Sequence, residues 1–161
     1  MSLTADQQQT LTNLLNAEVT TARQLKQLLE KEYEALTAGN PEQILAVTQE
    51  KDAALQQMLQ HDRERNRFLG TLPVAAAAGE LGKILDTLSP ESPASSAWQE
   101  LQGLAEALHQ QNTINGGMVA IGQRHTRQAL DILSGRTHDG DTYGPEGEQR
   151  QGASTDPLGK A

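Results

Sequence analysis

Mostly apolar residues recur at alternating intervals of four and three along residues 5–38, a stretch nearly free of helix breakers. This spacing is a heptad repeat, in which one face of a helix packs against a neighbouring helix. The repeat positions are Leu11, Leu15, Glu18, Ala22, Leu25, Leu29, Glu32 and Leu36. The pattern predicts one helix of roughly 30 residues, about 45 Å long at 1.5 Å per residue.

Two positions of this repeat hold glutamates, Glu18 and Glu32. Either they pair with basic residues of a neighbouring helix, or this part of the helix contact is open to water. The two lie about 21 Å apart along the helix axis, which is too far for shared acid–base chemistry. We favour ion pairing that sets the register of the helices, with Lys51, Arg63 and Arg65 as candidate partners.

The sequence Gly39-Asn40-Pro41 predicts a tight joint to a second helix. Glycine suits the left-handed residue that closes a helix, Asn40 can cap the next one, Pro41 fits its first turn, and Gln43 would complete a capping box. So short a joint makes the two helices antiparallel. The second helix is expected to continue to about Leu69.

Pro73 and the alanine run 75–78 interrupt this pattern. A short amphipathic helix is predicted over residues 80–88, followed by a connector over residues 89–96. Two serines are alternative caps for the last helix, Ser92 before Pro93 or Ser96 with Gln99.

The last helix is predicted over residues 98–133 and carries a wide apolar sector. Four apolar residues share one narrow arc, while Val119 and Leu130 project roughly 140° to 160° away from the first of them at about 100° per residue. The four are Ile114, Met118, Ile121 and Ile132. Gly103, Gly116, Gly117 and Gly122 weaken this helix by about 1 kcal/mol each relative to alanine. Two interpretations remain open: a helix completed by a partner, or a kinked core helix buried inside its own bundle.

After Ser134-Gly135 the chain becomes polar and rich in glycine. A segment with so few apolar side chains cannot offset its ordering entropy. We therefore predict a helical domain over residues 1–135 and a disordered polar tail over residues 136–161. The fold class is all-α, an elongated antiparallel bundle of long helices with one short helix.

Composition narrows the functional classes. Aromatic residues are 2% of the 161 residues, which suits helix-on-helix packing of aliphatic side chains. A net charge of −8 argues against nucleic acid, because binding to phosphates depends on Lys and Arg. The chain has no cysteine, no signal-peptide pattern and no long apolar run, so we expect a cytoplasmic protein that is not inserted in a membrane.

Motifs for chemistry are not found. His61, His109, His125 and His138 show no metal-ligand spacing, and the Gly116-Gly117 pair lacks the context of a phosphate-binding loop. A histidine phosphotransfer domain is the one enzymatic alternative, but neither His61 nor His125 has the Lys and Gly neighbours that such a domain places beside its histidine. We expect no enzyme activity, no cofactor and no metal.

Several segments resemble one known family. They are LLNAE at 14–18, LLEKEYEAL at 28–36, QEK at 49–51, ALDIL at 129–133 and TYGPEG at 142–147, together with Gln111, Asn112, Asn115, Gly116, Arg124, Arg127 and Gln128. In order and helical context they resemble the FlgN family of flagellar type III export chaperones, over residues from about 11 to 147.

The resemblance implies a cytoplasmic chaperone that binds the C-terminal helical region of the hook-filament junction proteins FlgK and FlgL. It would prevent their premature assembly and deliver them to the export gate. By resemblance, the subunit is bound by the terminal helix, and Tyr143 and Gly144 dock on the gate protein FlhA. The candidate subunit-binding residues are Asn112, Ile114, Asn115, Met118, Ile121, Arg124, Leu130 and Leu133.

A second hypothesis is a non-catalytic helical adaptor that self-assembles through its terminal helix. Weak homo-oligomerisation is compatible with either hypothesis.

Overall fold

The computed structural model describes residues 3–72 and 81–133 with their side chains, and the backbone of residues 142–143 and 149–150. Its contacts divide the chain into two compact units, Met1–Val119 and Ala120–Ala161, and each is described by itself. The all-α fold class is confirmed, because the described residues form four helices, three of them long.

The first helix, α1, spans Ala5–Ala38 and begins with a reciprocal cap. The Thr4 hydroxyl accepts from the Gln7 backbone N–H, and the Gln7 side chain accepts from the Thr4 N–H. Such a capping box satisfies two amide groups that the first helical turn leaves without partners. Most of the heptad positions are buried, including both glutamates, so the repeat identified the packed face of α1.

The second helix, α2, spans Pro41–Gly70 and is joined to α1 by a tight turn. Gly39 adopts φ 62°, and the N–H groups of Gly39 and Asn40 donate to Leu36 O and Ala35 O. These bonds form a Schellman closure. The Asn40 side chain accepts from the Glu42 and Gln43 amides, both at 3.2 Å, as expected. The expected capping box is incomplete. The Asn40 N–H donates to Ala35 O and not to the Gln43 side chain.

Helix α3 spans Leu81–Asp86, and helix α4 spans Pro93–Leu133. Of the two alternative caps, Ser92 is the one used, because its hydroxyl accepts from the Ser95 N–H at 3.2 Å. Helix α4 therefore begins five residues before the predicted start at Trp98. It continues without interruption through its glycines.

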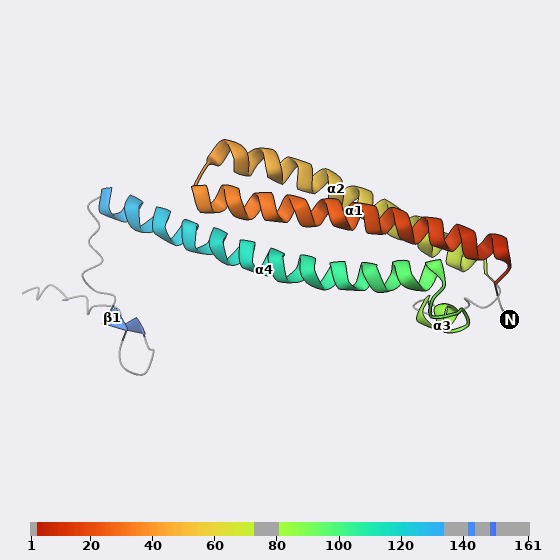
Figure 1. Ribbon diagram of the computed structural model, residues 1–161. Coiled ribbons are helices and arrows are strands. Elements are labelled where there is room, and N and C mark those ends of the chain that lie inside the picture. The colour runs from red at the N-terminus through yellow and green to blue at the C-terminus, as the bar shows by residue number, and fades with distance from the viewer. Residues whose placement is uncertain (1–2, 73–80, 134–141, 144–148, 151–161) are drawn as a thin grey trace, which may run out of the picture. The chain divides into compact units, whose positions relative to one another are not determined.

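Within the first unit, α2 and α4 both pack on α1 (Figure 1). Glu18 of α1 pairs with Arg65 late in α2, whereas Glu32, late in α1, pairs with Lys51 earlier in α2, so these helices are antiparallel. Arg23 pairs with Glu100, and Asn115 bonds to Glu32, so the α4 part of this unit runs parallel to α1. The main core gathers around the buried α1 residues Leu11 and Leu15 and includes α3, which closes this end of the bundle.

In the second unit, β1 (Thr142–Tyr143) pairs antiparallel with β2 (Gln149–Arg150). Thr142 lies opposite Arg150, and Tyr143 lies opposite Gln149. The rest of the predicted disordered tail, like the predicted boundary after residue 135 and the alanine run 75–78, lies outside the described residues. The domain limits stay a prediction.

Candidate protein-binding surfaces

Two buried ion pairs connect α1 to α2, as the sequence predicted. Lys51 Nζ lies 2.6 Å from Glu32 Oε2, and Arg65 Nη1 lies 2.5 Å from Glu18 Oε2. Fourteen residues, two heptads, separate the two members on each helix, so both pairs lie on the same helix faces. The third candidate, Arg63, is exposed and has no ion pair with the described residues.

A third side chain from α4 completes the pair of Glu32 and Lys51. Asn115 is 1% exposed, and its amide nitrogen donates to Glu32 Oε1 and to Leu29 O, both at 2.9 Å. Its amide oxygen accepts from the Gln111 side chain at 2.9 Å. Both oxygens of the Glu32 carboxylate therefore have partners, as buried charge requires.

The pair of Glu18 and Arg65 is less complete. Arg65 also bonds to Asp62 at 2.6 Å and stacks over the Trp98 ring at 5.7 Å. However, Glu18 Oε1 and Arg65 Nε are buried and have no hydrogen-bond partner among the described residues. Loss of water around Glu18 raises the pKa of its carboxyl group, and this effect exceeds the opposing effect of the Arg65 charge.

An open apolar groove runs beside this incomplete pair, with α1 as its floor and α2 and α4 as its walls. It consists of two contiguous cavities of about 410 and 270 Å³, which share Leu25, Leu55 and Leu108. We call this feature the α1 groove. Its other lining residues are Glu18, Ala22, Leu29, Lys51, Met58, Arg65, Trp98, Leu101, Gln102, Ala105, His109 and Asn112.

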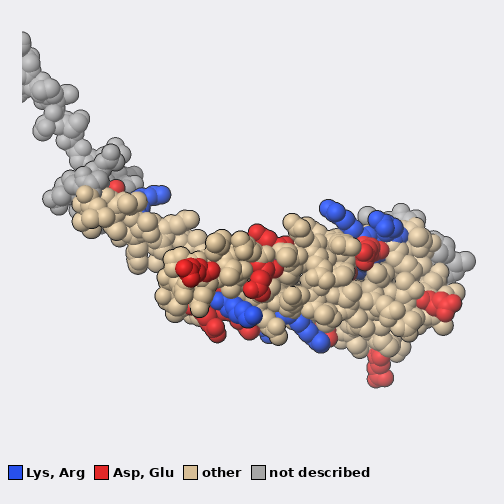
Figure 2. Space-filling view, turned by 90° about the horizontal axis from the view of Figure 1, so that it is seen from above, with Lys and Arg blue, Asp and Glu red and all other residues tan. Residues whose placement is uncertain are grey.

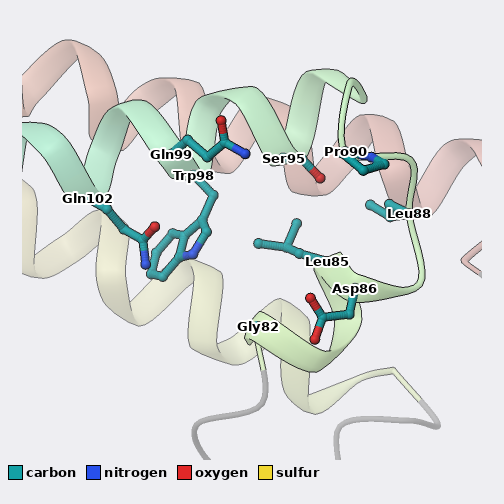
Figure 3. A pocket seen from close by; sticks show the side chains of 9 residues that line it. All are labelled: Gly82, Leu85, Asp86, Leu88, Pro90, Ser95, Trp98, Gln99 and Gln102. Atoms are coloured by element: carbon teal, nitrogen blue, oxygen red, sulfur yellow. The ribbon is translucent and has the colours of Figure 1, made fainter.

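A separate cavity of about 300 Å³, also lined by Trp98, lies between α3 and α4. In Figure 3 the Leu85 side chain points across it toward the Trp98 indole, with Asp86 at its edge. Gln99 and Gln102 also line it, so its wall is more polar than that of the α1 groove. The only Trp of the chain thus lines both cavities.

The terminal part of α4 leaves large apolar side chains uncovered. The exposed fractions rise from 50% for Ile114 and 53% for Ile121 to 83% for Leu133. Val119, Leu130 and Ile132 are exposed as well. Exposed apolar residues that follow one another along a helix mark a surface available to a partner.

The candidate subunit-binding residues divide into two groups in the structure. Asn112, Ile114, Ile121, Arg124, Leu130 and Leu133 are exposed, and Met118 is half-buried. Asn115 is different, because it is buried and all three of its described hydrogen bonds stay within the bundle. We assign Asn115 to the helix contact and omit it from the proposed binding surface.

The tail candidates are described only in part. Tyr143 is placed by its backbone in β1, and Gly144 lies outside the described residues. Their docking role stays a prediction.

Charge is distributed without large blocks on the face seen in Figure 2, where acidic and basic side chains are scattered among broad uncharged areas of the described surface. The described residues contain no cluster of three or more His, Asp or Glu side chains suited to hold a metal ion. No helix among the described residues is both long and apolar enough to span a membrane.

Sequence reasoning missed the α1 groove and the position of Trp98 in it. The spacing of the ion pairs was a usable signal for an unequal pair of sites. The two pairs are two heptads apart, and the same step from Asn115 back along α4 leads to Leu101, which cannot donate or accept a hydrogen bond. That the two flanking helices leave space above α1 follows only from the packing.

Together these features define a helical bundle with apolar surface that its own described residues do not cover. The chain matches the family model described as FlgN protein over residues 1–151. It therefore belongs to the FlgN family, the flagellar export chaperones. A search of curated proteins and a search of solved structures found no match to the chain.

Proposed function

We propose that this chaperone binds the C-terminal helical region of the hook-filament junction proteins FlgK and FlgL in the cytoplasm, without enzymatic activity. It keeps these subunits from premature assembly and delivers them to the type III export gate. One observation carries the proposal: the terminal part of α4 exposes Ile114, Ile121, Leu130 and Leu133. Membership of a chaperone family explains why such surface is retained.

Recognition is helix against helix. An amphipathic subunit helix places its apolar side on Ile114, Met118 and Ile121, and further along α4 on Leu130 and Leu133. Buried apolar area contributes about 25 cal/mol per Å² before the costs of association are subtracted. Asn112 and Arg124 flank these residues and provide polar contacts at the edge. No nucleotide hydrolysis is needed, because release follows when the gate takes the subunit.

The binding site is tested with the double variant Ile114→Asp, Ile121→Asp. Both side chains are about half exposed, so the variant is expected to fold while its affinity for purified FlgK and FlgL falls at least tenfold. Leu45→Asp is the matched control, because Leu45 is 61% exposed on α2. Unchanged binding by a folded double variant would place the site elsewhere.

Docking on the gate is assigned to Tyr143 and Gly144. An aromatic side chain buries a large apolar area for few immobilised bonds, which suits a docking contact. Tyr143→Ala is expected to keep its affinity for FlgK and FlgL but to lose binding to the cytoplasmic domain of FlhA and to stop export. Normal secretion by cells carrying Tyr143→Ala would refute the role.

A self-assembling adaptor is the second candidate, because the exposed α4 residues suit a second copy as well. Light scattering separates the two functions. A chaperone is expected to be a monomer or small dimer that forms a defined complex with FlgK or FlgL, whereas an adaptor forms larger assemblies without either subunit.

A further inference from the structure

The α1 groove offers space for one further helix. Its floor belongs to α1, its walls belong to α2 and α4, and its larger cavity measures about 410 Å³. The lining runs along α1 from Glu18 to Leu29, which is about 16 Å at 1.5 Å per residue. This length corresponds to about three helical turns. A helix enters such a groove by placing a ridge of side chains between the walls.

Each chain also carries a helical segment whose apolar side chains are uncovered. Residues 120–133 of α4, which we call the terminal α4 segment, cover about 21 Å, slightly more than the length of the groove. Its Ile121, Leu130 and Leu133 are all more than half exposed. Every copy of the chain therefore supplies one open groove and one uncovered helical segment of matching length.

Charge favours the terminal α4 segment as the occupant of the groove. Residues 1–119 contain 15 acidic and 8 basic side chains, whereas the segment contains two arginines, Arg124 and Arg127, and one aspartate. Three acidic residues each lie three or four positions from a groove-lining residue on their own helix, which places them at the edges of the groove. They are Asp52, Asp62 and Glu106. A segment with an excess of basic residues is attracted to these acidic edges.

The segment that enters the groove comes from another copy. Gln102, Ala105 and Asn112 of α4 line one wall of the groove, and α4 continues as one helix to Leu133. A helix that forms the wall fills the space beside that wall only if it breaks. A second copy supplies the same segment with its helix intact.

We propose that two copies of the chain form a weak dimer, in which the terminal α4 segment of each copy lies in the α1 groove of the other. Reciprocal exchange closes the assembly at two copies, because both grooves and both segments are then occupied. Each contact is short, so dimerisation is expected at tens of micromolar, on the order of 10–100 µM. The dimer covers both apolar surfaces when no other partner is bound.

One consequence of the dimer rests on the proposed function. Ile121, Leu130 and Leu133 contact the groove in the dimer and the subunit in the chaperone complex, so the two states exclude each other. Purified FlgK is therefore expected to convert the dimer into a complex that contains one copy of the chain.

The contact is tested by equilibrium sedimentation of the full chain at concentrations from about 1 to 200 µM. Leu55→Glu in the groove wall and Ile121→Asp in the terminal α4 segment each place a carboxylate in the apolar contact. Each is expected to weaken dimerisation at least about tenfold. A monomeric original chain at the highest concentration, or an unchanged dimer of Leu55→Glu, would overturn the proposal.

Leu59→Glu is the matched control for the groove variant. Leu59 is 57% exposed one turn further along α2 and does not line the groove. Its dimerisation is expected to stay within about twofold of that of the original chain. Equal weakening by Leu59→Glu and Leu55→Glu would mean that the contact lies outside the groove, which contradicts the proposal.

Mixing the two variants distinguishes exchange from pairing of identical surfaces. The Leu55→Glu chain keeps an intact terminal α4 segment, and the Ile121→Asp chain keeps an intact groove. A mixed dimer therefore contains one undamaged contact, whereas a dimer of either variant alone contains none. The mixture is expected to dimerise at least about fivefold more tightly than either variant alone. Absence of this gain would show that the two surfaces do not contact each other.

Trp98 reports directly which groove is filled. Because the chain has one Trp, labelling it with 5-fluorotryptophan gives one ¹⁹F signal from the groove. Unlabelled Leu55→Glu is expected to shift the signal of labelled Ile121→Asp, whose groove is intact. With the labels reversed, a much smaller shift is expected. Equal shifts in both experiments would overturn the proposed exchange.

The outcomes separate this inference from the proposed function. If the chain binds FlgK but stays monomeric at about 200 µM, the inference fails alone. If the exchanged dimer forms but binds neither FlgK nor FlgL, the proposed function fails alone. Assemblies larger than a dimer would show that the contact does not close on itself, and the proposal would be overturned in favour of the adaptor.

Discussion

Asn115 is the residue that most directly connects α4 to α1. It bonds to Glu32 Oε1 and Leu29 O while being almost fully buried. Both bonds are made in a region of low dielectric, where losing one partner of a buried charge costs more than the net strength of the bond. The attachment of α4 to α1 at this level therefore depends on one polar side chain.

Asn115→Ala is expected to reduce the free energy of unfolding by about 1–3 kcal/mol, because Glu32 Oε1 loses its buried donor. Urea unfolding followed by circular dichroism measures the effect. Asn112→Ala, an exposed position on the same helix, serves as the control and is expected to change stability by less than about 0.5 kcal/mol. Equal stability of the two variants would show that Asn115 has no structural role.

Glu18 predicts a dependence of stability on pH. Its pKa is raised by burial above the ordinary value of 4.5, so the folded chain holds a bound proton more readily than the unfolded chain. The stability that Glu18 contributes is therefore fully present below pH 4.5 and is lost as the pH rises through the raised value. Arg65, Asp62 and His61 are the charged or titratable neighbours that act on it.

Glu18→Gln removes this titration, so the comparison isolates it. The free energy of unfolding of the original chain minus that of Glu18→Gln is expected to increase as the pH is lowered from 7 to about 4. Urea unfolding at a series of pH values measures both chains, and titration of other groups largely cancels in the difference. A difference that decreases toward low pH would contradict the assignment.

Side-chain roles were predictable to different degrees. The heptad positions of Glu18 and Glu32 identified both ion pairs, because charge on a packed face needs an opposite charge nearby. Asn115 was predicted as a binding residue, yet the structure places it inside the helix contact. It lies between Ile114 and Gly116 in the sequence, and its burial depends on the rotation of α4 about its axis, which no local pattern fixes.

At the scale of elements, two kinds of glycine act in opposite ways. Gly39 ends α1 with φ 62°, a conformation that costs an L-residue about 1–2 kcal/mol. Gly103 lies within α4, and apart from its chain neighbours and the backbone of its own helix no atom lies within 4 Å of where a Cβ would be. No contact therefore opposes a larger residue there, and helix propensity favours one.

Gly39→Ala is expected to lower the free energy of unfolding by about 1 kcal/mol, and Gly103→Ala to raise it by up to about 1 kcal/mol. Thermal or urea unfolding of the two variants provides the comparison. The same sign for both substitutions would contradict the assignment of Gly39 to a left-handed closing position.

The long helices followed from sequence more closely than their ends. The heptad repeat located α1, and turn chemistry located the joint at Gly39 and Asn40, because each rests on local interactions. The start of α4 was ambiguous, since Ser92 and Ser96 both suit a cap. Tertiary contact decided it: Ala94 and Ala97 are buried in the main core, and this burial favours the earlier start.

For the whole molecule, the main uncertainty in sequence was whether the apolar sector of α4 is covered. Amphipathicity showed that the sector is wide, but coverage depends on how many helices surround it. In the described residues it is exposed from Ile114 onward, apart from the half-buried Met118. The α1 groove was likewise invisible in sequence, because its two walls come from residues more than thirty positions apart.

This exposure predicts an uneven distribution of local stability along one continuous helix. Every side chain of residues 120–130 is exposed, and Gly122 lies among them, so helical hydrogen bonds there have little tertiary support. By contrast, Leu25, Leu28 and Leu29 of α1 are at most 4% exposed. Helices that bury no apolar face open with low free energy, whereas core helices open only with global unfolding.

Hydrogen–deuterium exchange measures this difference. Amides of residues 120–133 are expected to exchange at least about tenfold faster than those around Leu25 in the free chain. Adding FlgK should slow exchange over residues 120–133, because the bound helix makes opening of α4 costly. Strong protection there in the free chain at low concentration would mean that another part of the chain or a second copy already covers these residues, and the proposed subunit site on α4 would be lost.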